Sequence, residues 1–374
     1  MKIMNLNILK VLRYVKIYGF LRTFSKIVGR LRPNFKFWLL LRFPFYTKNG
    51  KKVGIVGCGH QSFSSIAYFL STSTNCKFSF ALDIDEKAAE SFAYAYNTIS
   101  VGAKYDSSNK NFSLPDLVYI ASNHSTHTDY SLEFLKYGCD IYIEKPVSIN
   151  SEQINKLSDE IRKSNQKVYV GYNRPHSPAI RKIKLEYIDD GNPFTLSCFV
   201  SGHLIPEDHW YRDPAEGTRI VANVGHWIDL TTHLLFWSSK LPDYLDVSIL
   251  YSNTATPSDN ISIAIPSSNH DLINITFTSR CEPFEGVNET INFQKNDLIA
   301  KIDDFRTTKI WNKQKYKKYR HWPKNAGHKE SVLQPFNSNV ERKWDEIEYS
   351  TRLMLHIEQM ALLKTTQSRF QFLG

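Results

Sequence analysis

The chain has 374 residues, of which 42% are hydrophobic and 22% are charged, so it can form more than one globular domain with a substantial core. The formal net charge is +10, but residues 1–52 hold 13 of the 47 basic residues and no acidic residue. The remaining chain has 34 basic residues against 37 acidic ones. A body this close to neutrality argues against a protein that binds nucleic acid.

The five cysteines lie far apart and form no Cys-x-x-Cys pair and no cluster with histidine. We therefore expect buried, reduced thiols in a cytoplasmic protein, with neither a disulfide framework nor a metal site. These residues are Cys58, Cys76, Cys139, Cys198 and Cys281.

Residues 1–50 are predicted to form a basic amphipathic helical arm. Apolar residues recur there at roughly helical spacing, with lysine and arginine between them: Ile8, Leu9, Leu12, Val15, Tyr18 and Phe20. The uncharged run Phe37–Leu41 is too short to cross a bilayer. Two hypotheses remain open, namely helices packed on the body or on a second subunit, and an anchor that lies on an anionic membrane surface.

Beyond the arm, strands alternate with helices. The pattern predicts strands over 53–56, 77–83, 116–122 and 140–145, with helices after the first glycine turn, over 86–96 and over 126–138. Such alternation indicates right-handed βαβ units and a parallel sheet.

From about residue 190 the pattern changes to alternating apolar and polar segments separated by Asn, Pro and Ser. These segments, 194–204, 244–252, 260–268 and 271–280, predict an antiparallel sheet, and residues 339–364 predict a long amphipathic helix. The expected fold is α/β. A Rossmann domain over 51–172 precedes an α+β domain over 173–374 that has an open, mainly antiparallel sheet and a C-terminal helix.

The turn after the first strand carries a dinucleotide-binding pattern, G-x-G-x-x-S. The first glycine permits the tight turn, the second lets the backbone approach a pyrophosphate, and the third position needs only a small residue. A carboxylate 24 residues beyond the second glycine suits the adenosine ribose, and no basic residue follows it, which favours NAD over NADP. The residues expected to bind the cofactor here are Gly57, Gly59, His60, Gln61, Ser62 and Asp83.

Several segments in order resemble the Gfo/Idh/MocA oxidoreductase family: GIVGCG, ALDIDEKAAESFA, DLVYIASNHSTHTDYSLEFLKYGCDIYIEKPVS, VGYNRPHSPAI and HWIDL. The resemblance runs from about residue 51 to the C-terminus and is dense up to residue 180. The Glu-Lys-Pro triplet at 144–146 is its most specific part. The segment 209–230 and the basic arm resemble a subgroup associated with bacterial surface-polysaccharide synthesis.

The resemblance implies that Lys145 is catalytic at the carboxyl end of its strand, and that Pro146 follows a bend that can hold a cis peptide bond. Nicotinamide-side contacts are expected from Ser122, Asn123, His127, Glu144 and Lys145. His226 is a second catalytic candidate, with Asp229 three residues on to orient its ring. The family usually has an aspartate four residues before this histidine, and this chain has Ala222 there. Lys145 is therefore the stronger catalytic candidate.

The implied substrate-binding residues are Lys145, Arg174, His209, Trp210, Arg212, Asn223 and His226. The resulting prediction is a cytoplasmic, NAD-dependent oxidoreductase that acts on a sugar, most simply a nucleotide-activated sugar, and that forms a homo-oligomer. The arm would make a peripheral contact with the inner membrane face. Two alternatives stay open: an enzyme that recycles tightly bound NAD for net epimerisation, elimination or glycoside cleavage, and an inactive family member that serves as a membrane-associated scaffold.

Overall fold

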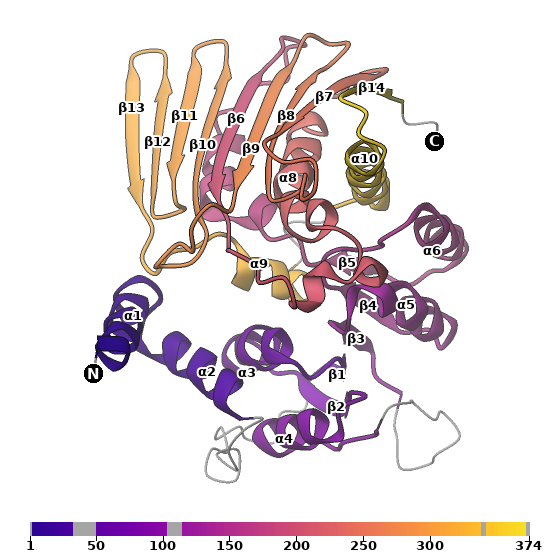
Figure 1. Ribbon diagram of the computed structural model, residues 1–374. Helices are drawn as coiled ribbons and strands as arrows, with labels where there is room; N and C mark the ends of the chain where they lie inside the picture. Colours follow the sequence, from indigo (N-terminus) through magenta and orange to yellow (C-terminus); the bar gives the residue numbers. More distant parts are fainter. Residues whose placement is uncertain (1, 33–49, 103–113, 338–341, 372–374) are drawn as a thin grey trace. The chain divides into compact units, whose positions relative to one another are not determined.

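The computed structural model describes residues 2–32, 50–102, 114–337 and 342–371, and the chain divides into two compact units (Figure 1). The parallel-sheet unit comprises residues 19–171 and 329–341, and the antiparallel-sheet unit comprises residues 1–18, 172–328 and 342–374. The predicted arm is divided between them at Gly19, which has φ +80°. Its residues 33–49 lie outside the described residues.

The parallel-sheet unit contains five strands in the order β2-β1-β3-β4-β5, and all four pairings are parallel, as predicted. The strands are β1 (Lys52–Val56), β2 (Lys77–Leu82), β3 (Leu117–Ile120), β4 (Asp140–Ile143) and β5 (Val168–Val170). Both faces of the three central strands are buried, because helices cover a sheet of this kind on both sides.

Capping side chains and a glycine mark the ends of three helices in this unit. Asp85 caps α4 by accepting the N–H groups of Lys87 and Ala88, and Asn150 caps α6 by accepting that of Gln153. A glycine, Gly138, follows α5 with φ +78°. The helices are α2 (Phe20–Leu31), α3 (Ala67–Ser73, preceded by a π-helical turn Ser62–Ile66), α4 (Glu86–Tyr96), the 3-10 turn His124–Thr126, α5 (His127–Lys136) and α6 (Ser151–Lys163).

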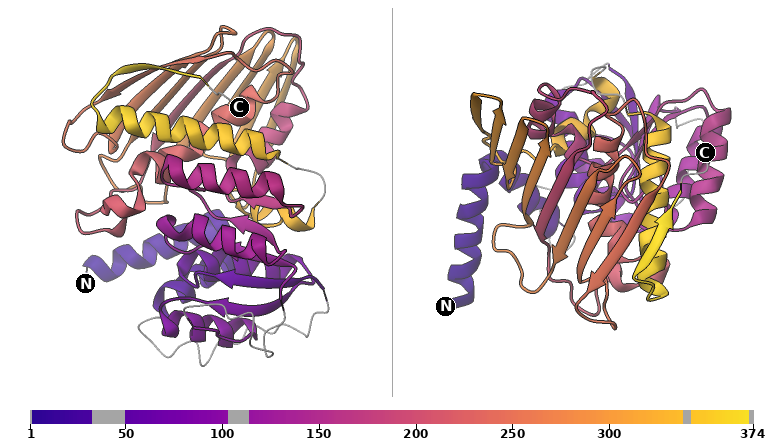
Figure 2. Two further views of the ribbon diagram at one scale, coloured as in Figure 1. Left: turned by 90° about the vertical axis from the view of Figure 1, so that its right-hand side faces the viewer. Right: turned by 90° about the horizontal axis from the view of Figure 1, so that it is seen from above.

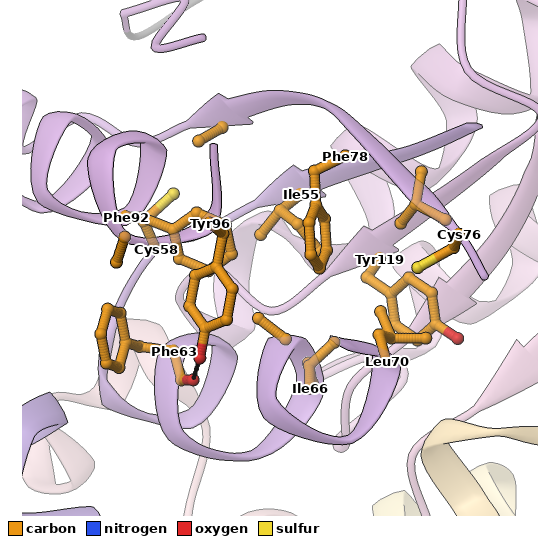
Figure 3. Close-up of a cluster of buried hydrophobic side chains, with 14 of the residues drawn as sticks. Ile55, Cys58, Phe63, Ile66, Leu70, Cys76, Phe78, Phe92, Tyr96 and Tyr119 are labelled. Atoms are coloured by element: carbon orange, nitrogen blue, oxygen red, sulfur yellow. Dashed lines mark hydrogen bonds between the residues drawn. The ribbon is translucent and has the colours of Figure 1, made fainter. Parts of the chain in front are cut away.

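Aromatic residues fill the core between the sheet and the helices α3 and α4 (Figure 3). The ring of Phe63 lies 5.1 Å from that of Tyr96, edge to face, and the Tyr96 hydroxyl donates to the Phe63 carbonyl oxygen at 2.6 Å. The helix after the glycine turn is therefore fixed both to the sheet and to α4.

A segment from late in the chain completes this unit. It contains α9 (His328–Val332) and the 3-10 turn Gln334–Phe336. The Tyr119 hydroxyl donates to the Val332 carbonyl oxygen at 2.6 Å, and the Gln334 amide donates to the Val170 carbonyl oxygen at 2.9 Å. No sequence pattern had predicted that residues 329–336 pack in this unit.

The antiparallel-sheet unit is built on nine strands in the order β13-β12-β11-β10-β6-β9-β8-β7-β14 (Figure 2). The pairing of β6 with β9 is parallel and the other seven are antiparallel, so the predicted mainly antiparallel sheet is confirmed. The strands are β6 (Thr195–Ser201), β7 (Leu245–Tyr251), β8 (Asn260–Pro266), β9 (Leu272–Thr278), β10 (Asn288–Lys295), β11 (Leu298–Asp303), β12 (Thr307–Asn312), β13 (Lys315–Arg320) and β14 (Gln367–Phe370).

Alternate residues of these strands are buried on one face of the sheet, where α8 and α10 pack. The predicted C-terminal helix is α10. The remaining elements of the unit are α1 (Lys2–Tyr18), the 3-10 turns Arg174–His176, Trp210–Arg212 and Pro214–Glu216, α7 (Pro178–Lys184), a π-helical turn Ile220–Val224, α8 (Gly225–Leu235) and α10 (Trp344–Leu362). No helix in the described ranges carries an apolar stretch that could reach across a bilayer.

Candidate cofactor and substrate sites

The glycine turn after β1 has the geometry that a dinucleotide needs. Gly57 has φ +83°, and a Cβ there would lie 2.4 Å from the Ala121 carbonyl oxygen, so only glycine fits. At Gly59 a Cβ would meet no atom within 4 Å, so this glycine leaves open space beside the turn. A pyrophosphate would use that space, because the helix that begins at His60 points its first N–H groups there.

Ser62 and His60 support the turn in ways that the sequence did not predict. The Ser62 side chain is fully buried, and its hydroxyl donates to the Gly57 carbonyl oxygen. Burial lowers the pKa of His60 to about 4, and the charges of Arg30 and Lys26 contribute to this shift. The His60 ring is therefore neutral at pH 7 and brings no positive charge to a phosphate.

Asp83 follows β2 and lies beside the glycine turn. Its Oδ2 accepts the Cys58 N–H at 2.6 Å, and its Oδ1 accepts the Asp85 N–H at 2.9 Å. These two backbone donors fix the carboxylate at the carboxyl end of the strand, which is where a Rossmann domain accepts the ribose hydroxyls of a dinucleotide. The residues of the turn and Asp83 thus fit an adenosine diphosphate group.

The structure adds Arg32, at the end of α2, to this site. Its side chain is 3% exposed, Nη2 donates to the Cys58 carbonyl oxygen, and the guanidinium lies 4.3 Å from the centre of the Phe63 ring. Burial lowers its pKa to about 10, so the charge persists at pH 7. Among the described residues, Nε and Nη1 have no hydrogen-bond acceptor. No motif places an arginine 25 residues before the glycine turn, so only the folded chain reveals it.

On the nicotinamide side of the sheet, His127 joins two loops. Its Nδ1 lies 2.7 Å from the Pro146 carbonyl oxygen, and its Nε2 lies 3.0 Å from the Ser122 carbonyl oxygen. The ring is 1% exposed, whereas Asn123 is exposed beside it. His127 therefore holds the loop after β3 to the peptide that follows Lys145.

Lys145 is half-buried at the carboxyl end of β4, and its backbone is fixed on both sides. Its N–H donates to the Glu144 Oε2 at 3.2 Å, and its peptide bond to Pro146 is cis, as the resemblance implied. Burial raises the pKa of Glu144, while the Lys145 charge and a 3.3 Å hydrogen bond from Gln61 oppose this rise. The lysine is thus held beside a buried carboxylate at the edge where Rossmann domains bind ligands.

In the antiparallel-sheet unit, the guanidinium of Arg174 is engaged within the protein. Its Nε and Nη2 donate to the two carboxylate oxygens of Glu289 at 2.8 and 2.9 Å, and the group lies 4.0 Å from the centre of the Trp227 ring. The Trp227 indole also donates to Glu289, at 2.8 Å. The guanidinium group of Arg174, which was expected to bind the substrate, is therefore engaged in a buried ion pair with Glu289.

Arg212 and Asn223 belong to a second polar cluster, around Asp259. The carboxylate of Asp259 accepts hydrogen bonds from Arg212 at 3.2 and 3.0 Å and from Arg219 at 2.7 Å. Arg219 also donates to the Asn223 side-chain oxygen at 3.2 Å. The structure thus brings two predicted substrate residues into one network, whose central members, Arg219 and Asp259, the sequence did not indicate.

His226 lies in the first turn of α8, half-buried, with its ring edge-to-face against Tyr172 at 6.0 Å. Asp229 serves a different partner. Its carboxylate is fully buried and accepts two hydrogen bonds of 2.9 Å from Arg342 and one of 3.1 Å from Ser350. The hypothesis that Asp229 orients His226 is therefore corrected, because this carboxylate neutralises an arginine 113 residues away.

The remaining predicted substrate residues are His209, the N-cap of the turn Trp210–Arg212, and Trp210, its first residue. His209 accepts the Tyr211 N–H at its Nδ1, at 3.1 Å, and Trp210 is 43% exposed. Within the part of the chain that the structure describes, no group of histidine, cysteine and carboxylate side chains is arranged to hold a metal ion. All five cysteines are free thiols, and Cys281 is the exposed one.

Comparison with known proteins places residues 51–172 in an oxidoreductase family described by its NAD-binding Rossmann fold. Oxidoreductase P35 of Formosa agariphila is 38% identical over 71 residues, which are 19% of this chain and 22% of the relative. Glucose-6-phosphate 3-dehydrogenase of Bacillus subtilis is 23% identical over 218 residues, 56% of this chain and 60% of the relative. The matches therefore span less than two thirds of these relatives' lengths.

Solved structures show the same fold over a larger share of the chain. A Gfo/Idh/MocA family oxidoreductase from Vibrio cholerae has a TM-score of 0.65 at 16% identity and covers 85% of this chain and 100% of its own. UDP-N-acetylglucosamine 3-dehydrogenase from Acidithiobacillus ferrooxidans has a TM-score of 0.64 at 16% identity, with 83% and 97% covered. Two further structures with TM-scores of 0.66 and 0.65 were determined with NAD and with NADP.

Proposed function

Because residues 51–172 of this chain match the model of the Gfo/Idh/MocA oxidoreductase family, whose fold is an NAD-binding Rossmann fold, we propose that the protein is an NAD-dependent oxidoreductase that acts on a hydroxyl-bearing sugar carbon. The observation that carries the proposal is the glycine turn. Gly57 has no room for a side chain, Gly59 leaves space for a pyrophosphate, and Asp83 is held beside both. Dinucleotide binding accounts for all three features together.

Lys145 is the proposed acid–base group. A bound nicotinamide supplies or accepts a hydride, and the sugar hydroxyl must gain or lose a proton in the same reaction. The buried Glu144 and the fixed backbone hold the Lys145 side chain at the strand end. We propose that Lys145 holds this proton, and that His226 is a second proton-handling candidate. His209, Trp210 and Asn223 remain proposed substrate contacts.

We propose NAD as the preferred cofactor, because the carboxylate of Asp83 would accept the ribose hydroxyls and repel a 2′-phosphate. Asp83→Asn should remove the repulsion but keep the side-chain shape, so the ratio of NADP affinity to NAD affinity should rise by about 10-fold or more. Titration of both cofactors by intrinsic fluorescence measures this ratio. Tighter binding of NADP than of NAD by the unaltered protein would contradict the assignment.

We propose that Arg32 positions the glycine turn. Arg32→Met keeps much of the side-chain volume but removes the hydrogen bond to the Cys58 carbonyl oxygen. Hydrogen bonds from charged donors contribute about 1.5–3 kcal/mol, so NAD affinity should fall by roughly 10-fold. Arg30→Met is the matched control, since Arg30 is exposed on the same helix. Equal NAD affinities for both variants and the unaltered protein, measured by calorimetry, would remove Arg32 from the site.

The proposed substrate is a nucleotide-activated sugar used in polysaccharide synthesis. The named activity of the glucose-6-phosphate 3-dehydrogenase supports a sugar substrate, and that of the UDP-N-acetylglucosamine 3-dehydrogenase supports a nucleotide-activated one. Mass spectrometry of the purified protein would first detect co-purifying nicotinamide. A screen of UDP-, GDP- and dTDP-sugars for NADH absorbance would then identify the substrate class. Activity on free sugars alone would reject the nucleotide-sugar part of the proposal.

Oligomerisation and location are also proposed. The open sheet of the second domain is the proposed surface for a homo-oligomer, by resemblance to the family. We further propose a cytoplasmic enzyme whose residues 1–50 contact an anionic membrane peripherally. The structure supports the helical part of this prediction, since α1 and α2 are both basic helices that expose apolar side chains such as Leu12 and Phe20.

A further inference from the structure

One edge of the antiparallel-sheet unit combines the helix α1 with the hairpin of β12 and β13 (Figures 1 and 2). The Trp322 indole donates to the Lys16 carbonyl oxygen at 2.8 Å, and the Lys324 N–H donates to the Ile17 carbonyl oxygen at 2.9 Å. Segments 300 residues apart therefore form one surface, which we call the basic edge. Its cationic members are Lys10, Arg13, Lys16, Lys301, Lys309, Lys313, Lys315, Lys317, Lys318 and Arg320.

The hairpin is strongly basic, although residues 53–374 together are nearly neutral. Residues 309–324 contain seven basic residues and no acidic one. Every residue of β13 except Tyr319 is exposed, so both faces of this edge strand meet solvent. Basicity was expected in the arm alone, but a second basic segment, which contains the hairpin, contacts α1.

Three lysines of the basic edge lie directly opposite one another across neighbouring strands. Lys301 on β11 pairs with Lys309 on β12, which pairs with Lys318 on β13. Like charges in such positions destabilise a sheet. Lysine on an edge strand can discourage strand-to-strand aggregation, but Lys301 lies two strands inside the edge, where that explanation does not apply. The row therefore indicates an anionic partner outside the chain.

Few carboxylates of the protein neutralise this surface. Among the described residues, Glu186 pairs with Lys317 and Glu285 pairs with Arg13, while the row of three lysines has no acidic partner. The charge of the basic edge is thus available to an external anion.

Exposed apolar side chains accompany the charges. On α1, Ile8, Leu9 and Leu12 are all more than half exposed, and on the hairpin Trp322 is 74% exposed. Tyr316 lies opposite Trp311 in the row of residues next to the lysines, with the two rings tilted and their centres 5.2 Å apart. Lysine and arginine together with leucine, tyrosine and tryptophan are the composition of surfaces that lie in the interface of a bilayer.

We propose that the basic edge binds the surface of an anionic lipid bilayer, with the hairpin of β12 and β13 as its second contact beside α1. This inference rests on the proposed peripheral contact of residues 1–50 and extends it to the sheet. At the basic edge itself a second copy of the chain is disfavoured, because a two-fold interface would set this mainly positive surface against itself, so the proposed homo-oligomer would use the rest of the open sheet. Nucleic acid is disfavoured, because it would leave the exposed aliphatic residues of α1 against a polar partner.

The test uses the full chain and sedimentation with vesicles of phosphatidylcholine and phosphatidylglycerol, compared with phosphatidylcholine alone. Each basic residue at such a surface contributes about five-fold in binding, so the double variant Lys318→Glu/Arg320→Glu, on one face of β13, should bind at least about 25-fold more weakly. The control Lys163→Glu/Lys167→Glu makes the same change in net charge on exposed residues of the other unit and should bind nearly as the unaltered protein does. NAD binding, measured in parallel, should be unchanged in both.

Thermal unfolding provides an independent readout. Lys318→Glu converts a like-charge pair with Lys309 into an attractive one, so this variant should unfold no earlier than the unaltered chain while binding vesicles less tightly. If the unaltered chain ignores anionic vesicles, both the arm contact and this inference fail. If it binds and the hairpin variant binds equally well, only the role of the hairpin is overturned. Equal losses in the hairpin and control variants, or tighter binding to duplex DNA than to vesicles, would also overturn it.

Discussion

Replacing Lys145 with methionine is expected to lower turnover by about 10²–10⁴-fold and to leave NAD affinity nearly unchanged. Methionine is one atom shorter than lysine, keeps most of its length, and cannot carry a proton. The backbone contacts that position residue 145, from Glu144 and through Pro146 to His127, do not depend on the side chain. Steady-state rates of NADH formation and NAD titration of the same preparation measure the two quantities separately.

Lys163→Met is the control for this experiment, because Lys163 is an exposed lysine at the end of α6 in the same unit. This control variant should keep the turnover and the NAD affinity of the unaltered protein. Turnover near the normal value in Lys145→Met would exclude Lys145 as the acid–base group and would transfer that role to His226. A loss of NAD binding that matched the loss of turnover would show instead that Lys145 holds the cofactor.

Replacing Arg174 with methionine is expected to lower the free energy of unfolding of the antiparallel-sheet unit by about 3–5 kcal/mol. The substitution leaves the carboxylate of Glu289 buried, at 2% exposure, with the Trp227 indole as its remaining side-chain donor. Urea denaturation followed by tryptophan fluorescence measures the change, since Trp227 lies directly against the lost guanidinium.

The double variant Arg174→Met/Glu289→Leu removes both charges and should recover much of the lost stability, because an apolar pair of similar size often replaces a buried ion pair without loss. This comparison distinguishes a structural role of Arg174 from a role in substrate binding. If Arg174→Met kept the stability of the unaltered protein but raised the KM for the sugar, the arginine would be a substrate contact, as the sequence first suggested.

Elements with local signals could be predicted from the sequence. The glycine turn, the strand that ends before Asp83 and the helix Glu86–Tyr96 all follow from short-range patterns: a glycine that must adopt positive φ, apolar runs of strand length, and a capping aspartate. The alternation of buried and exposed residues likewise predicted the second sheet. These patterns are readable because each depends on residues within a few positions of one another.

The partners of the buried charged side chains, in contrast, became visible only in the folded chain. Arg174 pairs with Glu289, Asp229 pairs with Arg342, and Arg32 reaches the carbonyl oxygen of Cys58, so a predicted substrate contact forms a core ion pair and a residue of the arm contacts the glycine turn. The sequence separations are 115, 113 and 26 residues. The partner of a charged side chain cannot be predicted from neighbouring residues in the sequence. A buried charge can be neutralised by any opposite charge that folding brings within about 3 Å.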